Sequence, residues 1–269
     1  MGGAAAVLSR ARAAALAGLL AALGLYHALA GRLPALTGDW DVVFVATAVI
    51  PLSLAAVWLA LPLAQRRGLL AAGVGMLAAA ALLDLTGADS LFNLSKLVGF
   101  TLLGFWFLDL FQLLGWVVLV AVLIPGVDAI SVWRGPTSYV VDEQPGLFDR
   151  ISVAFLVPGA EGAANIGPPD VLFFALFLAA ARRFDLRVGW TWVAMTVLLA
   201  TTLVLTATLD IGGLPALPAV CVGFLLPNVD LIWKERRDRR RRCRVPPRLG
   251  GGTRGRRGRS GRARLSRRG

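Results

Sequence analysis

Long apolar runs separated by short polar connections form the dominant pattern of this 269-residue chain. A helix that spans a bilayer needs about 20 mostly apolar residues, and eight runs reach or approach that length. We expect helices over Ala13–Ala30, Val42–Ala64, Gly68–Leu85, Leu91–Leu108, Leu110–Trp133, Gly167–Ala181, Val188–Leu209 and Ile211–Trp233. The third, fourth and sixth are the weakest, because they are short or contain Lys96, so seven or nine spans remain open. The pattern predicts an all-α, polytopic transmembrane helix bundle of about eight helices.

Composition supports this prediction. Hydrophobic residues make up 57% of the chain and charged residues only 16%, whereas soluble domains are about a quarter charged. The mean hydropathy is +0.70. These values argue against a soluble enzyme.

The net charge of +12 belongs to one tail. Residues 234–269 hold 17 Lys or Arg and two acids, a net charge of +15, and residues 1–233 carry −3. Such a segment is expected to be disordered. Beside a membrane span, it is best explained as a cytoplasmic tail that touches anionic lipid headgroups, at roughly 1 kcal/mol per nearby base. Phosphate attraction alone has no sequence preference, so no specific nucleic-acid partner is expected.

Positive charges on alternate connections test the predicted spans, because Lys and Arg collect on the cytoplasmic side. With eight helices, one set of alternate connections is basic: Arg10 and Arg12, Arg66 and Arg67, Arg182, Arg183 and Arg187, and the tail. The other connections are rich in Asp and Glu. The sequence therefore predicts a multi-pass protein of the cell membrane with a cytoplasmic carboxyl tail. Residues 1–30 also fit a cleaved secretory signal, which would leave seven helices.

Three regions follow from these features. Residues 1–109 form the amino-terminal membrane helices, residues 110–233 a membrane core, and residues 234–269 the tail. The core contains the longest external connection, residues 134–166, in which the apolar run Ile151–Ala160 is too short to span a bilayer. That run is interpreted as an interfacial segment or as a lid over a substrate site.

Two acids lie within predicted spans, where charge is costly and therefore indicates function. Asp128 is near the outer end of the fifth helix, and Asp170 opens the sixth. The two helices run in opposite directions, so both acids are expected at similar depth and can face one another. Two carboxylates in a dry site share one proton, and such a pair can hydrolyse amides: one accepts a proton from water and the other donates to the carbonyl oxygen.

A third element follows, the segment Gly212-Gly213-Leu214-Pro215-Ala216-Leu217-Pro218. Its composition predicts non-helical backbone at membrane depth, which is tolerated only against protein or a water-lined cavity. Its free amides and carbonyls can pair with an extended substrate strand. Neither cysteine, Cys221 or Cys243, nor the single His27 has metal-ligand spacing, so no metal or cofactor is expected.

Together, Asp128, Asp170 and Pro215-Ala216-Leu217 resemble the presenilin and signal peptide peptidase family of intramembrane aspartyl proteases, over roughly Trp116–Asn228. The resemblance implies a presenilin-like fold, catalytic roles for Asp128 and Asp170, and substrate binding by Gly167, Pro215, Ala216 and Leu217. The expected partners are membrane lipids and transmembrane peptide substrates. The orientation is similar to that of signal peptide peptidase, which implies substrates with a cytoplasmic amino terminus.

The chain departs from the family pattern at two positions. Val127 stands where tyrosine is usual, and Pro169 replaces the second glycine of the Gly-x-Gly-Asp motif. The alternatives are a proton- or ion-coupled transporter, in which the same aspartates bind cations at broken helices, and a catalytically inactive relative.

Overall fold

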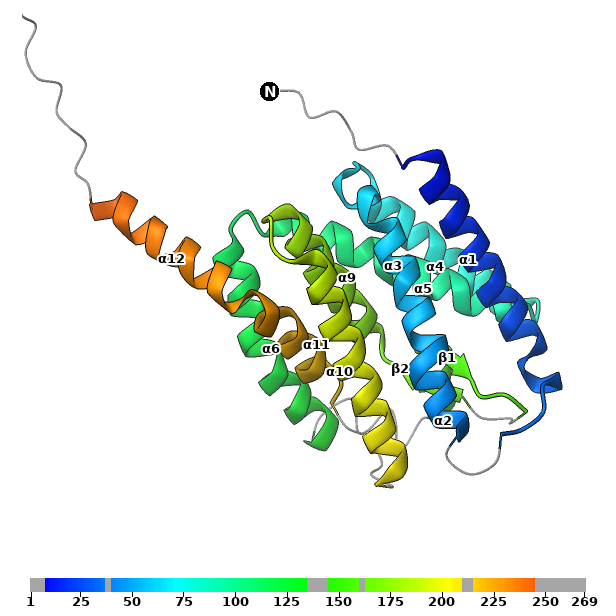
Figure 1. Ribbon diagram of the computed structural model, residues 1–269. Helices are drawn as coiled ribbons and strands as arrows, with labels where there is room; N and C mark the ends of the chain where they lie inside the picture. Colours follow the sequence, from blue (N-terminus) through cyan, green and yellow to red (C-terminus); the bar gives the residue numbers. More distant parts are fainter. Residues whose placement is uncertain (1–7, 37–39, 135–144, 160–162, 210–214, 245–269) are drawn as a thin grey trace, which may run out of the picture.

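The computed structural model describes residues 8–36, 40–134, 145–159, 163–209 and 215–244, which form a helical bundle with one small β-hairpin (Figure 1). The first half contains α1 (Arg10–Leu29), η1 (Ala30–Arg32), α2 (Trp40–Phe44), η2 (Val45–Val49), α3 (Ile50–Ala60), η3 (Leu61–Gln65), α4 (Leu69–Leu85), α5 (Asp89–Phe107) and η4 (Leu108–Leu110). The second half contains α6 (Leu114–Arg134), α8 (Pro145–Ile151), β1 (Val153–Leu156), β2 (Ala163–Ile166), α9 (Pro168–Arg183), α10 (Val188–Thr208), α11 (Leu217–Leu225), η5 (Leu226–Asn228) and α12 (Val229–Arg244). The prediction of an all-α membrane bundle is confirmed at this level.

Six helical stretches within the described residues are long and apolar enough to cross a membrane, as in a multi-pass membrane protein. They are Arg10–Arg32, Trp40–Gln65, Asp89–Leu110, Leu114–Ser131, Val188–Thr208 and Leu217–Arg237. The other two predicted spans are the helices α4 and α9, which have 17 and 16 residues and fall short of about 20. A short helix is accommodated most easily where neighbouring helices, rather than lipid, surround it, and this is the situation of α9.

The core of the bundle lies around α9, which contacts α5, α6, α10 and α11. From Phe174 to Ala181 every residue of α9 is buried. Phe177 stacks on Phe224 of α11 at 4.8 Å between ring centroids. Gly104 lets α5 and α9 come into close contact, because a Cβ at this position would collide with the carbonyl oxygen of Leu172. Small residues permit such close helix packing in membranes, where lipid is as apolar as the side chains.

The two ends of the bundle differ in chemistry. At one end, called the basic end here, α1 begins and α3, α5 and α9 finish. Arg12 Nε donates to the carbonyl of Leu59 at 3.0 Å, and Arg183 Nη1 donates to that of Leu108 at 3.2 Å. At the other end, the hairpin end, β1 of the β1–β2 hairpin contacts α5 and η2 (Figure 1).

The hairpin occupies part of the connection where a loop or lid was expected. β1 and β2 pair antiparallel, with Val153 opposite Ile166 and Leu156 opposite Ala163. The expected interfacial segment Ile151–Ala160 thus contains the four-residue strand β1, followed by a turn at Pro158-Gly159, and Gly159 has a φ of +67°. Residues 135–144 and 160–162 of this connection lie outside the described residues. A single apolar run of this length fits a half-buried strand as well as an interfacial helix, and this ambiguity concealed the hairpin.

Side chains from α1 and α5 hold the hairpin in place. The amide of Asn93 donates to the carbonyl of Ala154 at 2.6 Å, and the Ala154 N–H donates back to Asn93 Oδ1 at 2.8 Å. Tyr26 donates its hydroxyl hydrogen to the carbonyl of Leu156 at 2.5 Å. His27 is also buried, with Nε2 3.3 Å from Asn93 Nδ2. The side chain of Asn93 therefore pairs with the free edge of β1 as the backbone of a neighbouring strand would.

Lys96 fixes α8 in a related way. The side chain is only 4% exposed, yet no carboxylate is hydrogen-bonded to it among the described residues. Its ammonium group donates to the carbonyls of Asp149 (3.4 Å), Arg150 (3.1 Å) and Ser152, and it lies 4.0 Å from the centroid of the Phe92 ring. Helix carboxyl ends expose unpaired carbonyls and carry partial negative charge, so the hydrogen bonds of this cation are made with backbone. Asp84 and Asp149 lie close enough to interact with its charge.

The first residues of the expected basic tail are helical. Helix α12 continues to Arg244 and projects away from the bundle (Figure 1). Residues 234–244 of the expected tail are therefore part of this helix. Arginine has a high helix propensity, so the helix persists beyond its apolar start. Residues 245–269 lie outside the described residues.

Candidate functional site

Asp170 lies in the first turn of α9, and the sequence before it explains its position. Gly167 is the N-cap residue, followed by Pro168 and Pro169. The first amides of a helix have no intrahelical acceptor, so prolines are tolerated there. The replacement of glycine by Pro169 therefore fits the backbone.

The carboxylate of Asp170 folds back on its own turn. Oδ2 accepts a hydrogen bond from the Gly167 N–H at 3.2 Å, while the Asp170 N–H donates to the Gly167 carbonyl at 3.1 Å. A Cβ at Gly167 would lie 3.1 Å from that same Oδ2, so a larger residue would crowd the carboxylate. Gly167 was predicted to bind substrate, and in the structure it positions Asp170.

Asp128 lies on α6, one turn after Pro125, and is half-buried. Its Oδ2 accepts a hydrogen bond from the N–H of Leu217 at 3.2 Å. Leu217 is the first residue of α11 and belongs to the predicted Pro-Ala-Leu motif. Two motifs separated by 89 positions in the chain thus meet directly.

The Pro-Ala-Leu segment forms the entrance to α11. Pro215 lies before the helix, Ala216 is its N-cap, and Leu217 is buried. The Leu217 N–H is one of the first amides of α11, which need an external acceptor, and a carboxylate at this helix end is electrostatically favourable. Asp128 therefore caps α11. Gly212, Gly213 and Leu214 lie outside the described residues.

The two predicted acids come together. The carboxylates of Asp128 and Asp170 are close enough to interact electrostatically, and the buried thiol of Cys221 on α11 lies within range of both. Helix α11 packs against both α6 and α9. The structure thus gathers Asp128, Asp170, Gly167 and Leu217 at one place, toward the hairpin end.

The outer edge of β2 is the main feature of the site that sequence reasoning missed. Ala154 directs its N–H and C=O toward Asn93, away from its partner Asn165. In an antiparallel pair of this kind both residues point their backbone groups outward. The N–H and C=O of Asn165 therefore face the other edge of the hairpin, where no described residue hydrogen-bonds to them. The Pro158-Gly159 dipeptide between two short apolar runs was a signal for this hairpin.

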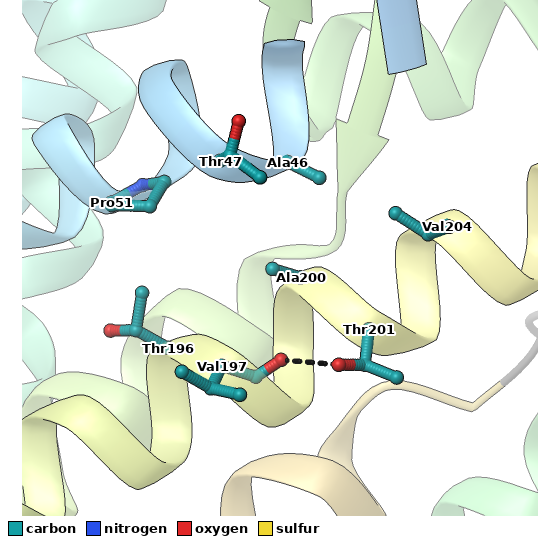
Figure 2. A pocket seen from close by; sticks show the side chains of 8 residues that line it. All are labelled: Ala46, Thr47, Pro51, Thr196, Val197, Ala200, Thr201 and Val204. Atoms are coloured by element: carbon teal, nitrogen blue, oxygen red, sulfur yellow. Dashed lines mark hydrogen bonds between the residues drawn. The ribbon is translucent and has the colours of Figure 1, made fainter. Parts of the chain in front are cut away.

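A separate groove, of about 400 Å³, lies between the helix through η2 and α3 and the facing side of α10 (Figure 2). Its lining is mainly apolar: Ala46, Thr47, Pro51, Thr196, Val197, Ala200, Thr201 and Val204. The hydroxyl of Thr201 donates a hydrogen bond to the carbonyl of Val197 at 2.8 Å. No acid lines the groove, so the candidate chemistry lies elsewhere.

Comparison with known proteins adds no assignment: no protein-family model, curated protein or solved structure matches the chain. Among the described residues, no three His, Cys, Asp or Glu side chains are placed to share a metal ion. The geometry of the aspartates and the two ends of the bundle therefore carries the functional argument.

Proposed function

We propose that this chain is an intramembrane aspartyl protease, similar to the presenilin and signal peptide peptidase family, that hydrolyses peptide bonds in transmembrane segments. One observation carries the proposal: the carboxylate of Asp128 accepts a hydrogen bond from the Leu217 N–H at 3.2 Å and also interacts electrostatically with the carboxylate of Asp170. The three motifs that define the resemblance therefore meet at one site, although they lie far apart in the sequence.

The mechanism uses the two carboxylates in different protonation states. Two adjacent carboxylates are costly to ionise together in a partly dry site, so the pair holds one proton. The ionised carboxylate accepts a proton from water as the water oxygen bonds to the carbonyl carbon of the substrate. The protonated carboxylate donates to the carbonyl oxygen, and the tetrahedral intermediate then breaks its C–N bond as the nitrogen is protonated.

Substrate helices must be extended before an amide reaches the acids. The outer edge of β2 offers the unpaired backbone of Asn165, and β2 leads through Gly167 into α9. Pro215 and Ala216 offer further non-helical backbone beside Asp128. Strand addition along these segments is the recognition mode that fits them.

We propose that the basic end and the carboxyl tail face the cytoplasm of a cell-membrane protein. The rule that basic residues lie inside supports this orientation. The candidate acids then lie toward the outer leaflet, as in the arrangement that resembles signal peptide peptidase. By analogy, the substrates are segments with a cytoplasmic amino terminus, and the tail contacts anionic headgroups.

A transporter is the second candidate, because Asp128 caps a helix that begins within the membrane region. Transporters bind ions at such broken helices. An inactive relative is the third, because Pro169 departs from the family motif. Each candidate gives a different result in one experiment.

The experiment uses the full chain in proteoliposomes with a synthetic transmembrane peptide, and mass spectrometry of the products. Asp128→Asn and Asp170→Asn should each lower the cleavage rate about 10²–10⁴-fold, the range for loss of a general acid or base. Asp109→Asn, an exposed acid at the basic end, is the matched control and should cleave at the wild-type rate. A transition-state mimic of aspartyl proteases should block cleavage.

Cleavage at the wild-type rate by the variant that carries both Asp128→Asn and Asp170→Asn would disprove the proposal. Ion or proton uptake without peptide cleavage would favour the transporter. If the wild type neither cleaves nor transports but Pro169→Gly gains cleavage, the chain is an inactive relative.

A further inference from the structure

A second pocket, of about 310 Å³, opens at the basic end, far from the candidate acids in the fold. It is formed where η3, η4 and the last turn of α9 meet. Its lining consists of Ala64, Gln65, Leu108, Asp109, Ala179, Arg182 and Arg183. The lining thus combines polar and charged side chains with small and aliphatic ones.

The charges around this pocket do not balance. Asp109, the acid of the lining, is engaged by Arg183, whose Nη1 lies 3.4 Å from its Oδ1. Among the described residues, Arg182 forms no ion pair or side-chain hydrogen bond. Arg182 lies close enough to a second cation, Arg12, for the two positive charges to interact.

Within the part of the chain that the structure describes, Arg12 forms no ion pair either. Its guanidinium donates to the carbonyls of Leu59 (3.0 Å) and Trp58 at the end of α3. These carbonyls satisfy its N–H groups but do not neutralise its charge. Two guanidinium groups therefore repel one another beside a pocket whose acid among the described residues, Asp109, is already paired with Arg183.

We propose that the pocket binds a phosphate group, which Arg182 recognises. A guanidinium presents a planar fork of N–H donors that matches two phosphate oxygens, and the Gln65 amide can supply a neutral donor. The bound anion would also relieve the repulsion between Arg12 and Arg182. The phosphate belongs either to an anionic lipid headgroup, whose glycerol would lie against Ala64, Leu108 and Ala179, or to free phosphate.

This binding is independent of proteolysis. Neither Asp128 nor Asp170 lines the pocket. The phosphate proposal and the protease proposal can therefore fail separately, and each has its own experiment.

The test measures ligand affinity of the full chain in uncharged detergent micelles. The two probes are phosphatidylglycerol, followed by native mass spectrometry, and inorganic phosphate, followed by the melting temperature, which a ligand of the folded state raises. Arg182→Gln should weaken binding about tenfold or more, as expected for loss of hydrogen bonds to a charged group. Arg182→Lys keeps the charge without the fork and should give an intermediate affinity.

Arg150→Gln is the matched control, because it removes the same charge from a side chain that is 73% exposed at the hairpin end. The basic tail is present in every variant, so its contribution cancels. Saturable binding of the lipid alone identifies a headgroup site, and displacement of the lipid by inorganic phosphate identifies a general phosphate site. Absence of saturable binding of either probe, or equal weakening by Arg182→Gln and Arg150→Gln, would overturn the proposal.

Discussion

Helices α6 and α9 each carry one candidate acid, yet they are packed in opposite ways. In α9 every residue from Phe174 to Ala181 is buried. Among the α6 side chains that the structure describes, residues 114–131, the buried ones are Leu114, Val117 and Ala121 in the first half, and Val127 beside Asp128 is 65% exposed. One acid stands on a helix enclosed by protein, and the other on a helix whose second half faces outward.

This difference in packing means that the two carboxylates are held in position by different interactions. Asp170 is fixed twice, by its own turn with Gly167 and by a helix enclosed on all sides. Asp128 follows Pro125, which has no N–H to donate to the carbonyl of Ala121, and its side chain is held by the Leu217 amide. The structure thus combines a rigid acid with one whose position depends on a single long-range bond. Four experiments test this contrast.

The largest effect is expected from removing the same side chain from each helix. Leu178 of α9 is fully buried, and Leu123 of α6 is 57% exposed. Leu178→Ala leaves a cavity and should lower the free energy of unfolding by about 3 kcal/mol. Leu123→Ala should change it by less than about 0.5 kcal/mol. Unfolding by sodium dodecyl sulfate in mixed micelles measures both, and similar losses would mean that α6 is as well packed as α9.

Glycines give the second test. A Cβ on Gly104 would press on Leu172 and Ala175 of α9, while one on Gly115 of α6 meets nothing within 4 Å. Gly104→Ala should cost about 2 kcal/mol, a typical figure for overpacking. Gly115→Ala should be neutral or slightly stabilising, because alanine favours helix. The same unfolding assay reports both, and tolerance of Gly104→Ala would contradict the close α5–α9 contact.

The third change loosens the segment that joins the two helices. Lys96→Met removes the donor from three carbonyls near α8, and unmade bonds of buried groups cost about 1–3 kcal/mol. Part of this is offset, because the ammonium group no longer has to be desolvated. Amide hydrogen exchange should therefore rise locally over residues 145–159. Arg150→Met removes an exposed cation nearby and should leave exchange unchanged; equal effects would show that Lys96 has no special role.

The smallest change in stability is expected from Pro125→Ala, below about 1 kcal/mol, since alanine restores a helical N–H. The straighter α6 should move Asp128 relative to Leu217. Exchange of the Leu217 amide, protected by that carboxylate, should become faster and the cleavage rate should fall. An unchanged exchange rate would show that Pro125 does not set the position of Asp128.

Much of the bundle could be predicted from local patterns. Runs of apolar residues located the helices, because each span must be apolar along its own length. Gly167, Pro168 and Asp170 predicted the start of α9 for an equally local reason, since capping and proline act within one turn. The hairpin was missed because Ile151–Ala160 fits more than one structure, and its partner strand Ala163–Ile166 is too short to signal itself.

The sequence by itself determined where the helices lie, which acids stand among apolar residues and where the positive charge accumulates. These properties depend on neighbours along the chain and on the cost of placing charge in lipid. Only the tertiary structure decided that Asp128 caps α11, that Asn93 holds the hairpin while Lys96 holds α8, and that Arg182 forms no ion pair within the described part of the chain. Those contacts join residues far apart in the chain, so they depend on how side chains of several helices pack together, which no local pattern encodes.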